Sequence, residues 1–418
     1  MTTLHPIDIS IIVIYLLAVV ISGFLLTRRA SQNIESYFLG GRTIPWYVLG
    51  VSNASGMFDI TGTMWMVMLL FVYGLKSLWI PWVWPTFNQI FMMIFLAAWL
   101  RRSGALTGAE WLKTRFGKGM SLELAHLSVV VFSLVTVVAF IAYAFIGVGK
   151  FAVEVLPWDV PAYTYAVVIL CVTATYVVLG GMYSVVLTDV IQFLLLTTAS
   201  LFVAAIAIYQ TTAAQLSAAT PAGWSSLWFG WRLKIDWADR LPAAAQAVRE
   251  GGYEMFTPFL AMAFCKGVLA SIAGPTPGYD MQRVLAARDD REASLMSGIV
   301  SPVLFVPRYF LIAGIAALAL VYYSPTLAAE THPDFESILP YVIQKFLPVG
   351  LVGILVAGLL AAFMSTFDST VNAGAAYLVN DVYKRYFNQG ASPRKLVLAS
   401  YTASVAVVMA GLLLSLIH

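Results

Sequence analysis

Oxygen-bearing side chains directly follow a long apolar run near the C-terminal end of the sequence. The run covers residues 347–364, and Ser365, Thr366, Asp368 and Ser369 come after it. On a helix, Ser365, Asp368 and Ser369 share one face, because they are spaced by three and four residues. Oxygen ligands on a membrane helix indicate a site for a small hard cation such as sodium. The alternative is that the hydroxyls bond back to carbonyls one turn earlier.

Three ionisable residues lie deep in other apolar segments, namely Asp59, Lys266 and Arg308. A charge at the centre of a membrane helix costs roughly 2.5–3.5 kcal/mol, so each residue is a functional candidate. Asp59 and Lys266 lie at matched depths in two interrupted segments. We expect them either to form an ion pair that closes an empty site or to bind the opposite charges of a zwitterion. A purely structural buried pair is the competing interpretation.

The composition indicates a membrane protein. Hydrophobic residues make up 60% of the 418 residues and charged residues only 11%, against roughly 25% charged in an ordinary soluble domain. A net charge of +3 is too small to indicate a nucleic-acid partner. The histidines are scattered without metal-ligand spacing and no nucleophile has a visible base, so the sequence does not predict an enzyme.

Hydropathy predicts ten apolar segments, and we expect an all-α polytopic protein with a single transmembrane domain over residues 1–418. The segments cover residues 8–27, 45–74, 78–100, 121–149, 161–179, 182–209, 253–273, 296–323, 340–380 and 397–417. Basic residues cluster after the first, third, seventh and ninth segments, which places these loops in the cytoplasm and the N-terminus outside. Short loops favour a bacterial inner (plasma) membrane as the location, with the lipid bilayer as the surrounding partner.

The second segment predicts a break in a membrane helix. Residues 50–62 are rich in glycine and small polar residues, which makes this stretch a poor continuous helix. Freed carbonyls at such a break can coordinate a cation, and exposed amides can face a substrate anion. Close helix packing is the alternative explanation. The seventh segment repeats the pattern, with Gly267 inside it and glycines and prolines over residues 274–278 at its end.

Two interrupted helices five segments apart predict an inverted repeat. Residues 8–27 would then form an extra helix, residues 45–209 the first repeat, and residues 253–417 an incomplete second repeat. This division assigns one helix fewer to the second repeat than to the first.

Several sequence motifs occur in a fixed order along the chain. They are YFLGGR at 37–42, TGAEWL with RFG at 107–117, GGMYSV with TDVIQ at 180–192, DMQRVLAAR at 280–288, and AAFMST followed by DVYK between 361 and 384. In these motifs the chain resembles the sodium:solute symporter family, the sodium/glucose-type and sodium/proline-type transporters. The resemblance implies a LeuT-like fold of five plus five inverted-repeat helices with one extra N-terminal helix. Because the sequence stops at His418 after nine core helices, we expect the last core helix to be missing, in a fragment, a truncated gene product or a natural short form.

The resemblance implies a principal sodium site between the first and eighth core helices. Its ligands would be the side chains of Ser365 and Thr366 and the backbone carbonyls of Val51, Ala54 and Ala362. Five oxygens without a formal charge suit a weakly held, releasable sodium ion.

A second sodium site is also implied, with Asp189, Ser365, Asp368 and Ser369 as its ligands. Asp368 departs from the hydroxyl residue expected at its position. The two carboxylates could hold a second sodium ion, share a proton, or bind one cation too tightly for release. For Asp189, a gate interaction with a cytoplasmic arginine is the alternative.

The family positions nearest the substrate are Asn53, Ser55 and Met57, to which we add Asp59 and Lys266 as candidate substrate ligands. The resemblance implies sodium-coupled symport of a small polar organic solute into the cell by alternating access, with sodium as the coupling ion. The solute would be a sugar, an amino acid or a carboxylate. A solute-sensing membrane module of the same fold and a proton-coupled transporter are the alternatives.

Overall fold

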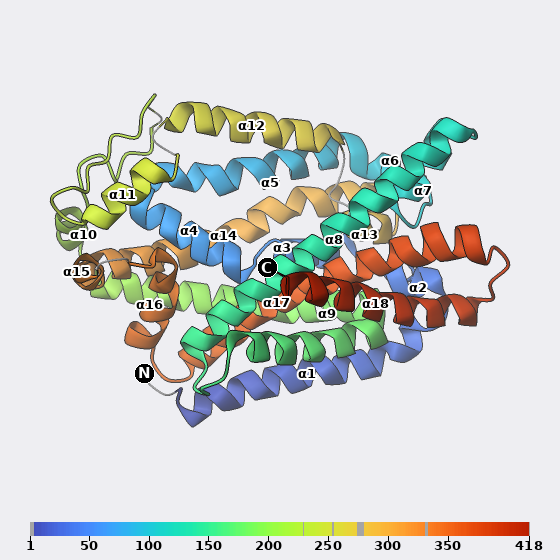
Figure 1. The fold of residues 1–418 in the computed structure, drawn as a ribbon, viewed down its shortest axis with the longest axis horizontal. Coiled ribbons are helices and arrows are strands. Elements are labelled where there is room, and N and C mark those ends of the chain that lie inside the picture. Colours follow the sequence, from blue (N-terminus) through green and yellow to red (C-terminus); the bar gives the residue numbers. More distant parts are fainter. Residues whose placement is uncertain (1–3, 229, 253–254, 274–279, 331–332, 418) are drawn as a thin grey trace.

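A computed structural model of the chain shows a bundle of long helices (Figure 1). The structure describes residues 4–228, 230–252, 255–273, 280–330 and 333–417, except for the side chains of residues 82–85, 114–115, 270–271 and 273. Within this part of the chain every regular element is a helix, as the apolar periodicity predicts.

The long helices form the bundle, and short helices connect or cap them. The long elements are α1 (Pro6–Ala30), α3 (Trp46–Gly56), α4 (Ile60–Tyr73), α5 (Trp79–Phe91), α8 (Met120–Val155), α9 (Ala162–Gln210), α12 (Phe256–Ala273), α14 (Asp290–Tyr322), α17 (Leu351–Ala376), η5 (Tyr377–Phe387) and α18 (Pro393–Ser415). The short elements are α2 (Ile34–Leu39), η1 (Gly40–Arg42), η2 (Leu75–Leu78), η3 (Met92–Leu96), α6 (Ala97–Arg102), α7 (Gly108–Phe116), α10 (Ala213–Ala219), α11 (Pro242–Glu250), α13 (Asp280–Ala286), α15 (Ser324–Ala329), η4 (Phe335–Ser337) and α16 (Ile338–Phe346).

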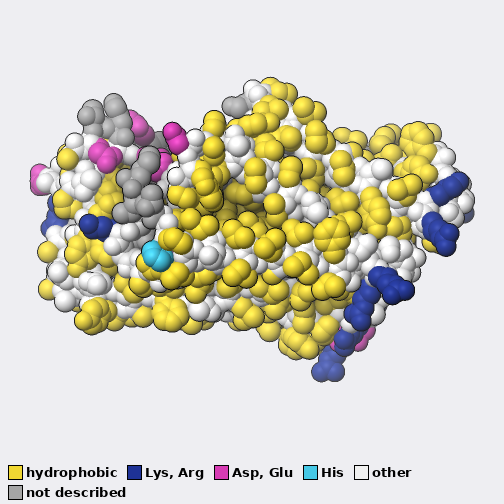
Figure 2. Space-filling model, turned by 90° about the horizontal axis from the view of Figure 1, so that it is seen from below, with side chains coloured by type: hydrophobic (Ala, Val, Ile, Leu, Met, Phe, Trp, Pro, Cys, Tyr) yellow, Lys and Arg dark blue, Asp and Glu magenta, His cyan; other side chains and the backbone are white. Residues whose placement is uncertain are grey.

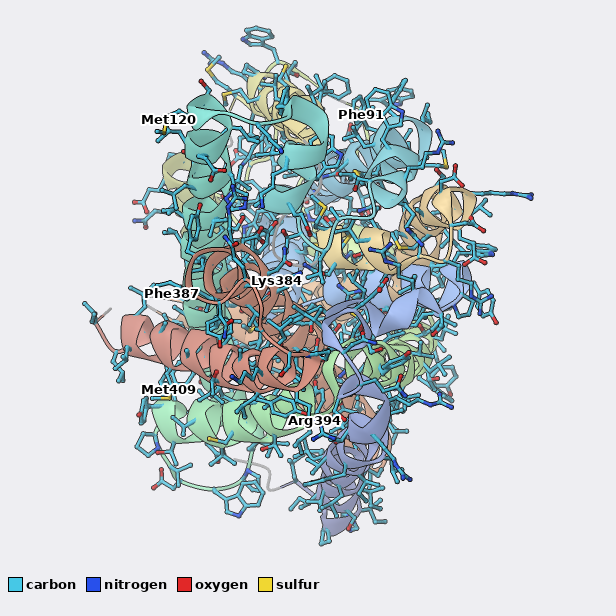
Figure 3. All side chains as sticks on the ribbon, turned by 90° about the vertical axis from the view of Figure 1, so that its right-hand side faces the viewer. Phe91, Met120, Lys384, Phe387, Arg394 and Met409 are labelled. Atoms are coloured by element: carbon cyan, nitrogen blue, oxygen red, sulfur yellow. The ribbon has the colours of Figure 1, made fainter. Side chains whose placement is uncertain are left out.

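Six helices are long and apolar enough to cross a membrane, or up to eight if each of two bent pairs counts as one span. Since α9 contains two of the predicted segments and α12 is a shorter apolar helix, the described helices account for the ten predicted segments. On the face shown in Figure 2, apolar side chains cover the middle, and most of the visible basic side chains lie at one end. The view onto that end includes Lys384 and Arg394, which lie on either side of the loop after the ninth predicted segment (Figure 3).

Helix α17 lies in the core of the bundle. Every residue from Leu355 to Ala376 is buried, and the helix packs against α1, α8, α9 and α18. A helix surrounded on all sides must satisfy its polar side chains within the protein. The oxygen-rich segment of α17 therefore has to find its partners on neighbouring helices.

The predicted break in the second segment is present. Helix α3 ends at Gly56 and α4 begins at Ile60, and the two helices are bent by 65°. The prediction of an interruption at Gly267 is wrong, because α12 runs through it as a helix that packs on α5. A single glycine costs a helix only about 1 kcal/mol, which packing can offset. Residues 274–278, the predicted end of the seventh segment, lie outside the described residues.

Helix α9 changes direction at Gly181, between two of the predicted segments. Gly181 has φ 50° and ψ −148°, and a Cβ atom there would lie 2.5 Å from the backbone oxygen of Tyr37. Only glycine combines this backbone conformation with so close an approach. The kink starts the helix that carries Asp189.

Candidate functional site

Asp189 is fully buried where α3, α9 and α17 meet. Its Oδ1 atom accepts a hydrogen bond from Ser365 on α17 at 2.5 Å. Its Oδ2 atom accepts hydrogen bonds from Ser52 on α3 and from Arg283 on α13, the latter at 2.8 Å. Hydroxyls from two further helices and one guanidinium therefore converge on a single carboxylate.

Arg283 supplies the positive charge in this cluster. Its side chain is 1% exposed, and its guanidinium donates to the hydroxyls of Ser52 at 2.7 Å and Ser369 at 2.6 Å in addition to Asp189. The guanidinium packs beside Gly56 at the end of α3, within ordinary van der Waals distance of a Cβ atom placed there. The structure thus shows the alternative that we considered for Asp189, contact with a cytoplasmic arginine.

A second buried carboxylate, Asp368, lies on α17 about one turn after Ser365. It accepts hydrogen bonds from the Tyr176 hydroxyl at 2.8 Å and from Ser369 at 3.1 Å. Asp189, Ser365, Asp368 and Ser369, the four expected ligands of a second sodium site, are therefore one hydrogen-bonded cluster. If both carboxylates are ionised, one guanidinium leaves one negative charge in excess, which favours the entry of a monovalent cation.

The residues expected at the principal sodium site also lie near one another. The Thr366 hydroxyl is 3.1 Å from the carbonyl oxygens of both Gly56 and Ala362, so it links α17 to the end of α3. The Ala54 carbonyl accepts the Met57 amide at 3.2 Å. Val51 lies one turn earlier on α3. The neutral oxygens at this junction have the chemistry that sodium prefers.

Back-bonding, the alternative for the α17 hydroxyls, also occurs. Thr366 contacts the Ala362 carbonyl, and Ser369 donates to the Ser365 carbonyl at 2.7 Å. Each of these hydroxyls also contacts a group outside its own helical turn, Gly56 or Arg283. The Thr366 and Ser369 hydroxyls thus bond both within α17 and to groups of neighbouring elements.

The expected substrate ligands on α3 are buried. Asn53 is 1% exposed and Ser55 is fully buried, and their side-chain polar atoms make no hydrogen bond to any described residue. Met57 lies in the break itself. Asp59 caps α4, with its Oδ1 atom 2.5 Å from the Gly62 amide nitrogen.

Asp59 and Lys266 are not brought together. Lys266 lies on an exposed part of α12, the helix at the edge of the bundle that packs on α5 (Figure 1). A different cation, Arg308 on α14, lies next to Asp59 and acts electrostatically on it. Its guanidinium donates to the Met57 carbonyl and lies 5.7 Å from the centre of the Phe58 ring.

Three members of the Asp189 cluster were not identified from the sequence as site residues. Arg283 belongs to a motif that signalled the family, but nothing in the sequence pairs it with Asp189. Ser52 lies in the predicted break, where small polar residues indicate an interrupted helix and do not by themselves identify a ligand. Tyr176 gave no signal, because tyrosine is common in membrane helices.

A separate buried cluster lies at the basic end of the molecule. Asp381 accepts a hydrogen bond from the Thr107 hydroxyl at 2.5 Å and contacts the His126 ring at 2.9 Å. The neighbouring Asn380 side-chain amide donates to Glu110 at 3.1 Å. These contacts join α7, α8 and η5. They bring together in space two of the family motifs that lie far apart in sequence.

Comparison with known proteins gives the same family as the motifs. The family model described as "Sodium:solute symporter family" matches residues 37–418. The chain is 25% identical to sodium/glucose cotransporter 4 of Mus musculus, over 99% of the chain and 61% of that protein. It is 26% identical to the sodium/glucose cotransporter of Vibrio parahaemolyticus, over 98% of the chain and 74% of that protein. The chain thus spans about three fifths of the length of the mouse relative.

Solved structures support the fold. A sodium-coupled sialic acid symporter, solved in a substrate-bound outward-open state, superposes with a TM-score of 0.78 at 18% identity, covering 99% of this chain and 82% of that one. This likeness confirms the predicted LeuT-like, all-helical fold class. The division into repeats remains a prediction.

The match to the family covers most of the chain, and the family consists of multi-pass transporters of the plasma membrane rather than enzymes. Sodium is named as the coupling ion of the relatives and of the solved neighbour. The chain belongs to the sodium:solute symporter family.

Proposed function

We propose that this protein couples the inward movement of sodium to the uptake of a small polar organic solute by alternating access. The observation that carries the proposal is the convergence on Asp189, where Ser365 of α17, Ser52 of α3 and Arg283 meet one fully buried carboxylate. A structural ion pair alone does not require hydroxyls from two further helices. Hydroxyl and carboxylate oxygens from several helices are what a coupled sodium ion requires.

In the proposed cycle, sodium first binds between α3 and α17. Ser365, Thr366 and the carbonyls of Val51, Ala54 and Ala362 are the proposed ligands. The contact of Thr366 with the Gly56 carbonyl supports this placement, because it shows that α17 reaches the end of α3. Binding there would hold the two helices in one arrangement, and a ligand that favours one arrangement shifts the population toward it. Solute would bind next, and the bundle would then rock.

Sodium would leave through the second proposed site, formed by Asp189, Ser365, Asp368 and Ser369. Arg283 already binds two of these residues, so it acts there as a tethered cation. Sodium and the guanidinium would compete for the same oxygens. On this proposal, exchange of Arg283 for sodium at Asp189 is part of the transport cycle.

Proton coupling is the second candidate function. It is favoured by Asp368, a second buried carboxylate close to Asp189 whose oxygens are held by Tyr176 and Ser369. Two neighbouring carboxylates can share a proton instead of holding a sodium ion. Transport that depends steeply on pH and not on sodium would favour this candidate.

The first test is thermal stabilisation of the purified protein in sodium compared with potassium. A ligand that binds only the folded state raises the unfolding midpoint. We expect sodium to raise it in the wild type and not in the Ser365→Ala/Thr366→Ala variant. The matched control is Thr173→Ala/Ser400→Ala, which removes two buried hydroxyls whose hydrogen bonds to described residues lie within their own helices. Equal midpoints in sodium and potassium for the wild type would contradict sodium coupling.

A further inference from the structure

Two groups of opposite charge flank the break between α3 and α4. Arg308 reaches the break from α14, which runs beside α3 and α4 (Figure 1). It is 7% exposed, and a small pocket next to it is also lined by Met57, Thr86, Ser301 and Tyr309. The pocket therefore combines a guanidinium with hydroxyl-bearing side chains and the backbone of the break.

Asp59 belongs to a second small pocket at the break. That pocket is also lined by Thr61, Tyr143, Phe363 and Thr366. Thr366 is a proposed sodium ligand, so a molecule at the break would lie next to the sodium site. A shared residue at two sites is a direct physical route for coupling them.

Buried polar groups on α3 face the same region. Gly50 packs so closely on α14 that a Cβ atom there would lie 2.3 Å from the Ile299 side chain. Asn53 follows Gly50 by three residues, which places the two on the same face of α3, and Met57 comes directly after the end of the helix. The Asn53 amide has no hydrogen bond to a described residue although it is 1% exposed. Buried amides normally have partners, so this amide indicates a polar ligand.

We propose that Arg308 binds a carboxylate group of the transported solute, which makes that solute an organic acid or an amino acid rather than a neutral sugar. This inference rests on the proposed transport function and names its substrate class. The guanidinium now donates to a neutral carbonyl, that of Met57. A carboxylate brings a full negative charge and two oxygens that can accept in parallel, whereas the carbonyl offers one neutral oxygen, so a carboxylate would displace that carbonyl.

The cost of Arg308 supports the same conclusion. A charged residue in the middle of a membrane helix is expensive and is a functional candidate for that reason. The planar guanidinium fits the two oxygens of a carboxylate, whereas a neutral sugar offers it only hydroxyls. Asp59, on the other side of the break, would then receive a cationic or hydroxyl group of the same solute.

The test measures thermal stabilisation of the purified protein in saturating sodium. The probes are small carboxylates, both hydroxy acids and amino acids, with neutral sugars of similar size for comparison. We expect carboxylates to raise the unfolding midpoint and sugars not to. In Arg308→Gln we expect carboxylate affinity to fall by at least about 30-fold, because one partner of a buried charged pair is removed. Arg308→Lys keeps the positive charge but loses the planar guanidinium that can donate two parallel hydrogen bonds, so its carboxylate affinity should fall less than that of Arg308→Gln.

Two controls separate this inference from the proposed function. Arg291→Gln removes an exposed arginine from the same helix and should leave carboxylate binding unchanged. The sodium-induced shift without solute shows that each variant is folded and that sodium coupling stands. If that shift remains in the wild type and neutral sugars stabilise it while no carboxylate does, or if Arg308→Gln binds carboxylates as well as the wild type, the inference is overturned and the sodium site is not.

Discussion

The cluster around Asp189 and the break around Arg308 differ in how fully their polar groups are bonded. Both oxygens of Asp189 are bonded to side chains from other elements. At the break, by contrast, Asn53 and Ser55 make no side-chain hydrogen bond to a described residue. A fully bonded network is rigid and holds its oxygens in place for an ion. A partly bonded one keeps capacity for a solute that comes and goes.

Removing one partner from the bonded cluster should have the largest effect. Asp189→Asn leaves the Arg283 guanidinium buried without its carboxylate, and breaking a buried ion pair in this way costs about 3–5 kcal/mol. We expect a loss of that size in the free energy of unfolding, measured by denaturant titration in detergent.

The double variant Asp189→Asn/Arg283→Met provides the control. Replacing both charges with neutral groups removes the unpaired guanidinium, so most of the stability should return, while the stabilisation by sodium should not. If sodium still stabilises this double variant as it does the wild type, Asp189 is not a sodium ligand. The cluster around Asp189 and the break around Arg308 would then differ less in their roles than we propose.

Removing only the Arg283 guanidinium should strengthen sodium binding. The expected change in free energy is smaller than the loss of stability in Asp189→Asn. Arg283→Gln takes away a tethered cation that binds Asp189 and Ser369. We expect the apparent sodium affinity to rise about tenfold, or about 1.4 kcal/mol, because competition and like-charge repulsion are both removed. A sodium titration of the unfolding midpoint measures it.

Arg288→Gln is the matched control for that titration. Arg288 is exposed and bonds the Thr43 carbonyl outside the cluster, so its removal should leave sodium affinity unchanged. Loss of the sodium response in Arg283→Gln would instead show that the guanidinium holds the sodium ligands in position.

Much of the fold could be predicted from the sequence, because hydropathy and glycine content act locally. The apolar segments and the break after Gly56 depend only on neighbouring residues. The grouping of Asp189 with residues of α17 came from the family motifs. Contact of Asp189 with an arginine was one of the alternatives, but the sequence could not identify Arg283 as that arginine, because this depends on where a short helix, α13, packs in three dimensions.

The pairing expected for Asp59 shows the limit of reasoning from depth. Asp59 and Lys266 lie at similar depths in two segments, but depth does not fix which way a helix faces or which helix lies beside it. Helix α12 packs on α5, and α14 takes the place next to the break. Arg308, which also lies deep in an apolar segment, therefore reaches the position that we expected for Lys266.

The smallest expected effect concerns Lys266, and it tests directly whether Arg308 occupies the place that we expected for that lysine. Lys266 remains a candidate ligand from the sequence, but it lies on an exposed part of α12. Surface changes are usually worth less than about 0.5 kcal/mol, so Lys266→Gln should alter carboxylate binding only slightly, whereas Arg308→Gln should abolish most of it. Titration of both variants with the same carboxylate in sodium decides between them. A larger loss in Lys266→Gln would mean that α12 moves toward the break when solute binds, and that the pair at the substrate site is Asp59 with Lys266.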